Sequence, residues 1–245
     1  MDDARNLEKL MLFGLTRQEA LLYLCLYHNG ELTGYEASKL TGISRSNVYM
    51  GLADLVDQGA AYVAGGSANK YTAVPIDEFC DNYVRKLTVA KDYLEKNIPA
   101  PAAVGEGYIT IQGARHIEDK VLHMLRGAEK RIYLSAPLMT LDWLSGELLG
   151  LSDRRIKVVL IADRIPEALE ENTDKGILFY KLNEDEMKSR CNQIRLIIDS
   201  AYVLTGDMKG ESSDTCLYSD QVNFVTVFKE AMHNEMELIE LRRSE

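Results

Sequence analysis

Residues 32–59, LTGYEASKLTGISRSNVYMGLADLVDQG, constrain the fold most, because they hold two helix signals separated by a tight break. Thr33 precedes Glu36 by three residues, which is the capping-box spacing for the start of a helix. Gly42 suits the left-handed position after that helix, and Ser44 can cap a second helix. The pattern predicts a helix-turn-helix, and an ordinary pair of packed helices is the alternative.

The segments around this motif predict a winged helix. Residues 16–30 have the pattern of an apolar helix that precedes the motif. Residues 61–63 and 70–74 can form two strands, joined by a turn at residues 65–69. A hairpin directly after the second helix of such a motif is a wing. We therefore expect a winged helix-turn-helix domain over residues 1–74.

Length, hydrophobic content and charge limit the classes of protein to which this chain can belong. The 245 residues allow one or two domains, and the 46% of hydrophobic residues can fill their cores. No stretch approaches the ~20 apolar residues of a membrane span, and the N-terminus lacks a signal-peptide core. We therefore expect a cytoplasmic protein with no membrane partner. The net charge is −10, but residues 1–74 hold six basic and eight acidic residues, so weak non-specific DNA binding is expected.

Residues 75–98 predict one long helix whose apolar residues follow heptad spacing. Winged-helix regulators commonly pair in order to read two half-sites, so we expect this helix to dimerise. A helix packed against its own domain is the alternative. Pro99, Pro101 and Gly105 predict a domain boundary after the helix. The expected dimer contacts are Ile76, Cys80, Tyr83, Leu87, Ala90 and Leu94.

Residues 106–245 alternate strand and helix patterns, which predicts an α/β domain with helices over a mixed sheet. The run KVVLIA within residues 156–162 is typical of a strand covered on both faces. The cysteines form no CxxC pair, and His116 and His123 lie seven residues apart, a spacing that favours two partly exposed histidines. We expect neither a metal site nor a cofactor.

Four segments resemble, in order and spacing, the N-terminal domain of the TrmB family of transcriptional regulators. They are GLTRQEA at residues 14–20, ISRSNVY at 43–49, LADLVDQG at 52–59 and KYTAVP at 70–75. The resemblance covers about the first third of the chain. It implies a winged helix, a dimerising linker helix and a degenerate phospholipase D-like domain. Sugar-sensing members of the family carry an added C-terminal domain, so a maltose-type ligand is not expected here.

Residues 192–207, NQIRLIIDSAYVLTGD, resemble the core strand pair of the phospholipase D superfamily. That family uses a His-x-Lys-x4-Asp motif. Asp199 matches its aspartate, but Asn192 and Ile194 occupy the histidine and lysine positions. An amide does not replace an imidazole nucleophile, and isoleucine cannot stabilise phosphoryl charge. We expect no enzymatic activity and no catalytic residues.

The sequence therefore predicts a dimeric regulator that binds double-stranded DNA, with a C-terminal domain that senses a small-molecule effector or mediates assembly. An effector is expected at strand ends near residues 135–137 or 163–164. Arg45 can contact guanine, while the wing contacts phosphate or the minor groove. A protein-interaction or ligand-sensing module whose winged helix does not bind DNA is the alternative. The expected DNA-binding residues are Thr33, Ser44, Arg45, Ser46, Asn47, Tyr49, Asn69 and Lys70.

Overall fold

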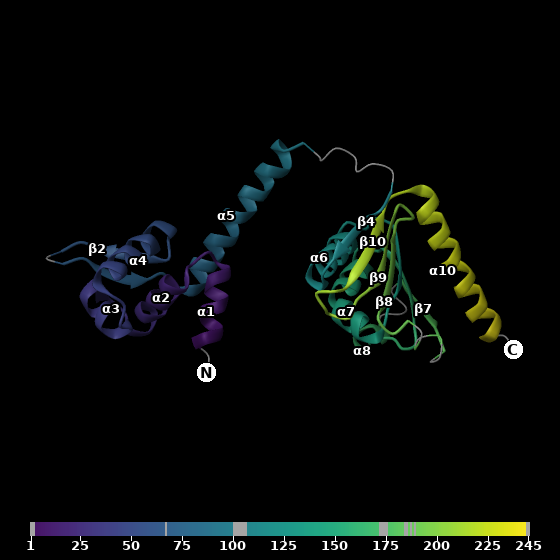
Figure 1. The fold of residues 1–245 in the computed structure, drawn as a ribbon, viewed down its shortest axis with the longest axis horizontal. Helices are drawn as coiled ribbons and strands as arrows, with labels where there is room; N and C mark the ends of the chain where they lie inside the picture. The colour runs from purple at the N-terminus through teal and green to yellow at the C-terminus, as the bar shows by residue number, and fades with distance from the viewer. Residues whose placement is uncertain are drawn as a thin grey trace. The chain divides into compact units, whose positions relative to one another are not determined.

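The computed structural model divides into two compact units, Met1–Pro101 and Ala102–Glu245 (Figure 1). Each unit is described by itself. The residues that the structure describes are 3–66, 68–99, 107–171, 176–183, 186, 188 and 190–243. Residues 100–105 of the predicted boundary and Ser67 of the predicted turn lie outside these ranges.

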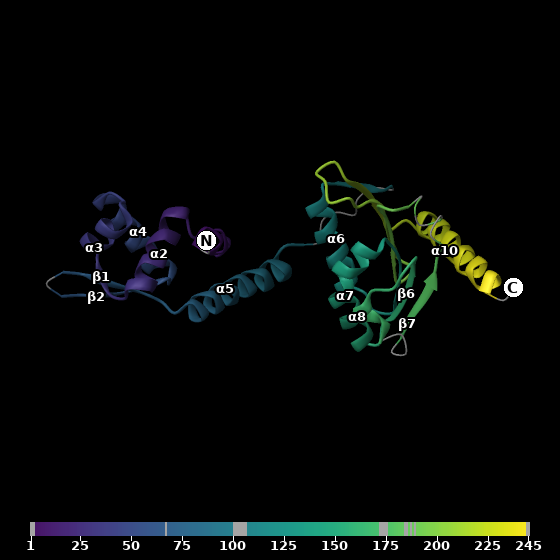
Figure 2. The same cartoon turned by 90° about the horizontal axis from the view of Figure 1, so that it is seen from below.

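The N-terminal unit contains helices and a three-stranded sheet of order β1-β3-β2 (Figure 2). Its elements are α1 (Asp3–Leu12), α2 (Arg17–Asn29), β1 (Leu32–Thr33), α3 (Gly34–Thr41), α4 (Arg45–Gln58), β2 (Ala61–Ala64), β3 (Lys70–Ala73) and α5 (Ile76–Asn97). The predicted helix-turn-helix and wing are therefore both present. Strand β1 was not predicted, since two residues are too few to show a period.

Local chemistry explains where these helices begin. The capping box at Thr33 and Glu36 is present, because the Thr33 side chain and the Glu36 side chain each bind the other residue's backbone N–H. The prediction that the Ser44 side chain caps the second helix is wrong. Ser44 holds the position before α4, but its hydroxyl makes no capping hydrogen bond within the described chain and lies 3.3 Å from the Ser46 hydroxyl.

The core of this unit joins the helix-turn-helix to α5. Leu22 and Leu26 of α2 and Leu52 of α4 are fully buried, and Phe79 of α5 packs in the same cluster. The Tyr23 hydroxyl donates a buried hydrogen bond of 2.8 Å to the carbonyl of Val74. Helix α5 therefore begins inside the winged-helix core, and its first turns are fixed to it.

The C-terminal unit is a seven-stranded mixed sheet of order β4-β10-β9-β8-β5-β6-β7. Strands β5, β6 and β7 are parallel, and the remaining pairs are antiparallel. The elements are β4 (Ile109–Gln112), α6 (Ala114–Arg126), β5 (Arg131–Ser135), α7 (Leu138–Asp153), β6 (Lys157–Ala162), α8 (Glu167–Glu170), β7 (Ile177–Lys181), β8 (Gln193–Ile198), β9 (Tyr202–Asp207), β10 (Thr215–Ser219) and α10 (Val222–Arg243).

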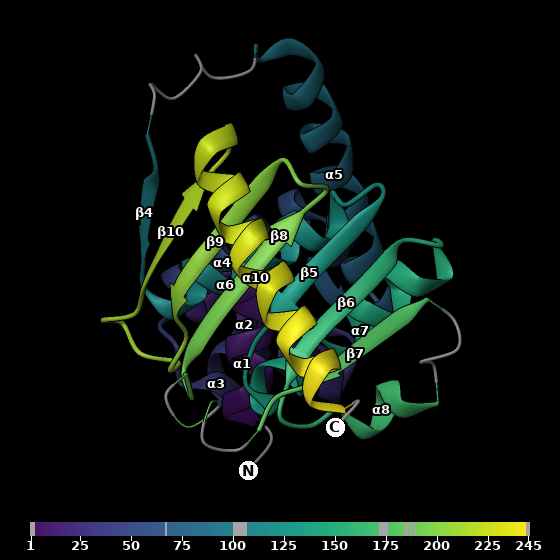
Figure 3. The same cartoon turned by 90° about the vertical axis from the view of Figure 1, so that its right-hand side faces the viewer.

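Helices cover both faces of this sheet. Helices α6 and α7 contribute to a core that includes Val158 and Leu160 of β6. Helix α10 crosses the opposite face (Figure 3), where its Met232 packs in a cluster with Val159 and Ile161. Alternate residues of β6 thus enter two different cores, which explains its continuous apolar sequence. The predicted fold class, a winged helix followed by a linker helix and an α/β domain, is confirmed.

Candidate nucleic-acid interface

Side-chain hydrogen bonds fix the turn between α3 and α4. Gly42 adopts φ 70°, and its N–H donates to the Ser38 carbonyl at 3.0 Å. The Ser38 hydroxyl donates to the Ile43 carbonyl at 2.6 Å, and the Thr41 hydroxyl donates to the Ala37 carbonyl at 2.7 Å. The turn therefore holds the first turn of α4 in a defined orientation relative to α3.

Helix α4 presents the predicted DNA-binding side chains on its solvent face. Val48, Leu52 and Leu55 are fully buried on its inner face. The exposed residues at its start include all five positions that the sequence assigned there, namely Ser44, Arg45, Ser46, Asn47 and Tyr49. This part of the predicted set is therefore accessible to solvent at the start of α4.

Two aromatic contacts join α3 to this surface. The Arg45 guanidinium lies 4.5 Å from the ring centroid of Tyr35, an exposed residue of α3, in a cation–π arrangement. The Tyr49 ring lies against Gly34, where an added Cβ would approach within 2.5 Å of the ring. Sequence reasoning missed Tyr35 and Gly34. A tyrosine ten residues before an arginine forms no local pattern that could have indicated the contact.

The wing carries less free positive charge than the sequence suggested. The Lys70 ammonium pairs with the Glu31 carboxylate at 2.9 Å, and this hydrogen bond raises the pKa of Lys70. Asn69 is exposed beside it. The Thr33 hydroxyl is occupied as well, because it donates to the Glu36 carboxylate at 2.8 Å. Thr33 is therefore a capping residue, and Lys70 is a paired cation rather than a free one.

Acidic residues limit how much of α4 can approach phosphate. Asp54 and Asp57 follow the first turns of the helix on its solvent side, and Asp57 is exposed. Met50, which the prediction omitted, is 61% exposed between these two regions. Like charges disfavour contact with the DNA backbone. The candidate interface is therefore confined to the start of α4, Tyr35 of α3 and the wing.

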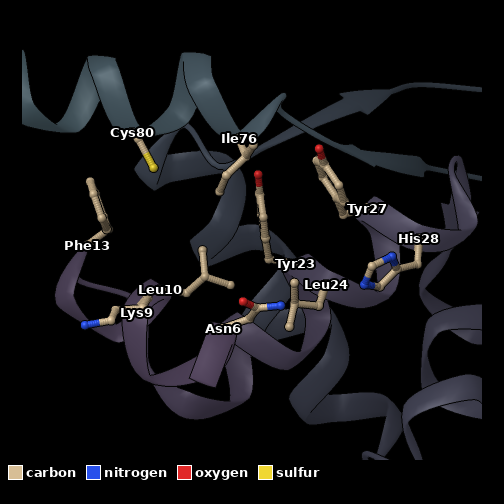
Figure 4. A pocket seen from close by; sticks show the side chains of 10 residues that line it. All are labelled: Asn6, Lys9, Leu10, Phe13, Tyr23, Leu24, Tyr27, His28, Ile76 and Cys80. Atoms are coloured by element: carbon tan, nitrogen blue, oxygen red, sulfur yellow. The ribbon is translucent and has the colours of Figure 1, made fainter. Parts of the chain in front are cut away.

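The first three predicted dimer positions face their own domain. Ile76 and Cys80 line a pocket of about 310 Å³ between α1, α2 and α5, together with Phe13 and Tyr23 (Figure 4). The Tyr83 ring meets Phe13 with centroids 5.6 Å apart. For this part of α5 the alternative prediction, packing against its own domain, describes the structure.

The second half of α5 leaves apolar side chains exposed. Leu87 is 56% exposed, Leu94 is 50% exposed, and Ala90 between them is also exposed. Val84 and Ile98 extend the same helix face at both ends and are exposed as well. We call the face formed by Val84, Leu87, Ala90, Leu94 and Ile98 the α5 stripe. A solvent-exposed stripe of this kind is typical of an interaction surface.

The phospholipase D-like motif is occupied by structural residues. Ile194 is fully buried in the sheet core. Asp199 has φ 53°, and its carboxylate accepts N–H bonds of 2.8 Å from Glu129, Lys130 and Arg131. Burial alone would raise the pKa of this carboxyl, but the three N–H donors together lower it. The described residues contain no group of three His, Cys, Asp or Glu placed to hold a metal ion.

Among the helices of the described residues, none has the length and apolar character needed to cross a bilayer. Residues 10–77 match the family described as sugar-specific transcriptional regulator TrmB. The uncharacterized protein YrhO of Bacillus subtilis is 31% identical over 153 residues, which is 60% of this chain and 54% of that protein. The HTH-type sugar sensing transcriptional regulator TrmBL1 of Pyrococcus furiosus is 27% identical over 165 residues, 65% of this chain and 48% of that protein. The chain thus spans about half the length of these relatives.

Two solved structures match parts or most of this chain at low sequence identity. The match to TrmBL2, described as an archaeal chromatin protein, covers 97% of this chain and 99% of that one. The sequence identity is 20% and the TM-score is 0.45. The match to Nuc from Salmonella typhimurium, a phospholipase D family member, covers 52% of this chain and 93% of that one. The sequence identity is 16% and the TM-score is 0.42. Similarity at this level carries no conclusion about activity.

Proposed function

From the premise that this chain carries a TrmB-family domain over residues 10–77, we propose that it is a sequence-specific, DNA-binding transcriptional regulator that acts as a dimer. Its partner is double-stranded DNA, and its C-terminal unit senses a small-molecule effector or mediates assembly. The relative TrmBL1, named as a transcriptional regulator, supports the DNA-binding part of this proposal.

The observation that carries the proposal is the presentation of Arg45. The guanidinium is exposed at the start of α4, and the Tyr35 ring beneath it restricts its orientation. An oriented guanidinium is suited to a bidentate contact with guanine in the major groove. Ser44 and Ser46 flank Arg45 in the sequence, and their exposed hydroxyls, 3.3 Å apart, can bind a base edge or a phosphate.

The α5 stripe provides the proposed dimer contact. A winged helix with few free cations gains from pairing, because two copies double the phosphate contacts on one DNA site. Exposed Leu87 and Leu94 on one helix face are suited to packing against the same helix of a second copy. Cys80 and Tyr83 instead pack against the winged-helix core, and Ile76 lines the pocket beside them.

We infer further that the C-terminal unit has no phosphodiesterase activity. The position of the motif lysine is filled by Ile194, which is fully buried and cannot reach a phosphate. Asp199 already accepts three backbone N–H bonds. The residues of this strand pair therefore support folding rather than phosphoryl chemistry.

The test is footprinting of the purified protein on the DNA upstream of its own gene, across a salt series. We expect a protected site of two related half-sites whose occupancy falls as salt rises. Arg45→Ala is expected to cost about 1–3 kcal/mol of binding free energy and to relax base preference at one position of each half-site. Arg5→Ala, at an exposed position of α1, is the matched control and should leave the base preference unchanged.

Unchanged affinity and base preference in Arg45→Ala would contradict the assignment of this residue. The second candidate function is a protein-interaction module whose winged helix does not bind DNA. Asp54, Asp57 and the Glu31–Lys70 ion pair favour it, because they leave few free cations on this surface. Absence of protection at every salt concentration, from a protein shown to be dimeric, would select this second function.

A further inference from the structure

A second pocket lies in the C-terminal unit, between helix α6 and the antiparallel part of the sheet. Its volume is about 260 Å³. Lys120 and His123 of α6 line one side, and Ile198, Tyr202 and Tyr218 of β8, β9 and β10 line the other. The β8–β9 register pairs Ile198 with Tyr202 at one end of the hairpin. The pocket is therefore at the opposite end from Asn192, and it is separate from the phospholipase D-like motif.

Lys120 is a partly buried cation that has no counter-charge among the described residues. Its ammonium lies 3.8 Å from the centroid of the Tyr218 ring. Within the described ranges no carboxylate lies at ion-pair distance from it. Burial lowers its pKa, because the charged form loses hydration. An anion entering the pocket would supply the missing counter-charge.

Two stacked tyrosines form the floor beside this cation. The rings of Tyr202 and Tyr218 are nearly parallel, at 10°, with centroids 6.2 Å apart. Burial, Tyr202 and the nearby Asp220 carboxylate raise the pKa of Tyr218, so its hydroxyl remains protonated and can donate. No hydrogen bond from either tyrosine hydroxyl or from His123 is formed within the part of the chain that the structure describes.

We propose that this pocket binds a small phosphate monoester with a flat or ring-shaped organic body. The Lys120 ammonium, the His123 imidazole and two phenol hydroxyls are donors that match the several acceptor oxygens of a phosphate. The exposed part of Tyr202 offers a face on which the organic body can stack. The site differs from the strand ends near residues 135–137 and 163–164 where sequence reasoning expected an effector.

Binding is tested on the full chain without DNA, by isothermal titration with phenyl phosphate, inorganic phosphate and the neutral compound phenol. We expect saturable binding of phenyl phosphate, weaker binding of inorganic phosphate and the weakest binding of phenol. Lys120→Met keeps the apolar stem and removes the charge, so it should weaken phenyl phosphate binding about tenfold or more. Lys157→Met, at an exposed lysine of β6, is the matched control and should bind as the unmodified protein does.

Tyr202→Phe is a second variant, since it keeps the stacked ring and removes one hydroxyl. It should weaken phenyl phosphate binding severalfold while the unfolding temperature stays unchanged. Equal binding of phenol and phenyl phosphate, equal weakening by Lys120→Met and Lys157→Met, or no saturable binding of either phosphate would overturn the proposal. The effector role of such a ligand rests on the proposed regulatory function. Because binding is measured without DNA, a failed site and a failed DNA-binding function give different results.

Discussion

At the scale of single residues, Asp199 shows how a side chain that matches the aspartate of a catalytic motif can instead stabilise the fold. Its carboxylate accepts N–H bonds from Glu129, Lys130 and Arg131, three consecutive residues that lead into β5. We predict that Asp199→Asn lowers the free energy of unfolding by about 1–3 kcal/mol, towards the lower end because the group is partly exposed. Asparagine tolerates the left-handed conformation, so the loss reports the carboxylate, that is, its charge and the second acceptor oxygen that the amide lacks. Urea unfolding followed by circular dichroism measures it.

The same substitution has a defined pH dependence. Since the folded-state pKa of Asp199 is lowered, its stabilisation is complete above the unfolded value of about 3.9 and is lost as pH falls through the folded value. The difference between the unmodified protein and Asp199→Asn should therefore shrink as pH falls below about 4. Asp207→Asn is the control, because this half-exposed carboxylate makes only a 3.7 Å contact with the Lys209 ammonium among the described residues. An equal loss in both variants would contradict the role of Asp199.

A second prediction at this scale concerns the ion pair of Glu31 and Lys70. Glu31→Gln removes the carboxylate that holds the Lys70 ammonium at 2.9 Å, so the freed cation can reach phosphate. We expect about two- to fivefold tighter DNA binding. The binding constant should also fall more steeply with salt, by the amount that corresponds to up to about one added phosphate contact per chain. Glu8→Gln, at an exposed glutamate of α1, makes the same charge change elsewhere. Equal effects of both variants in a salt titration would show that only net charge matters.

At the scale of elements, helix α5 has two parts with different surroundings. Its first turns are fixed to the winged-helix core by Phe79, whereas the α5 stripe is exposed. We predict that Leu87→Glu converts the proposed dimer into a monomer, because a charge would have to be buried where the two α5 helices are proposed to pack. Sedimentation equilibrium should then give the 27.6 kDa chain mass rather than twice that value. Val89→Glu is the control, as Val89 is 64% exposed on the opposite face. The proposed pairing through α5 would be contradicted if the unmodified protein were a monomer. It would also be contradicted if Leu87→Glu and Val89→Glu both caused dissociation.

Element patterns also show what the sequence can and cannot predict. The helices and most strands follow from the spacing of apolar residues and from local caps such as Thr33 with Glu36. The capping bond of Ser44 was predicted wrongly, because its hydroxyl lies against Ser46 instead of a backbone N–H. Heptad spacing identified the apolar face of α5 but could not show that Phe79, Cys80 and Tyr83 pack against the winged-helix core.

At the scale of the whole molecule, the candidate sites depend on contacts between distant parts of the sequence. Glu31 meets Lys70 across 39 positions. Lys120 meets Tyr218 across a still longer separation, and the pocket that they share was not predicted. Such pairs have no period and no motif, so they appear only when the topology is known. The fold was therefore more predictable than the sites that it builds.

The position of Asp199 has a consequence for how a sequence motif is read. An aspartate that accepts three backbone N–H bonds contributes to the fold whether or not a nucleophile lies nearby. Its presence in a sequence therefore carries no information about turnover. An assignment of hydrolase activity needs the histidine and lysine of the motif as well, and positions 192 and 194 hold asparagine and isoleucine instead.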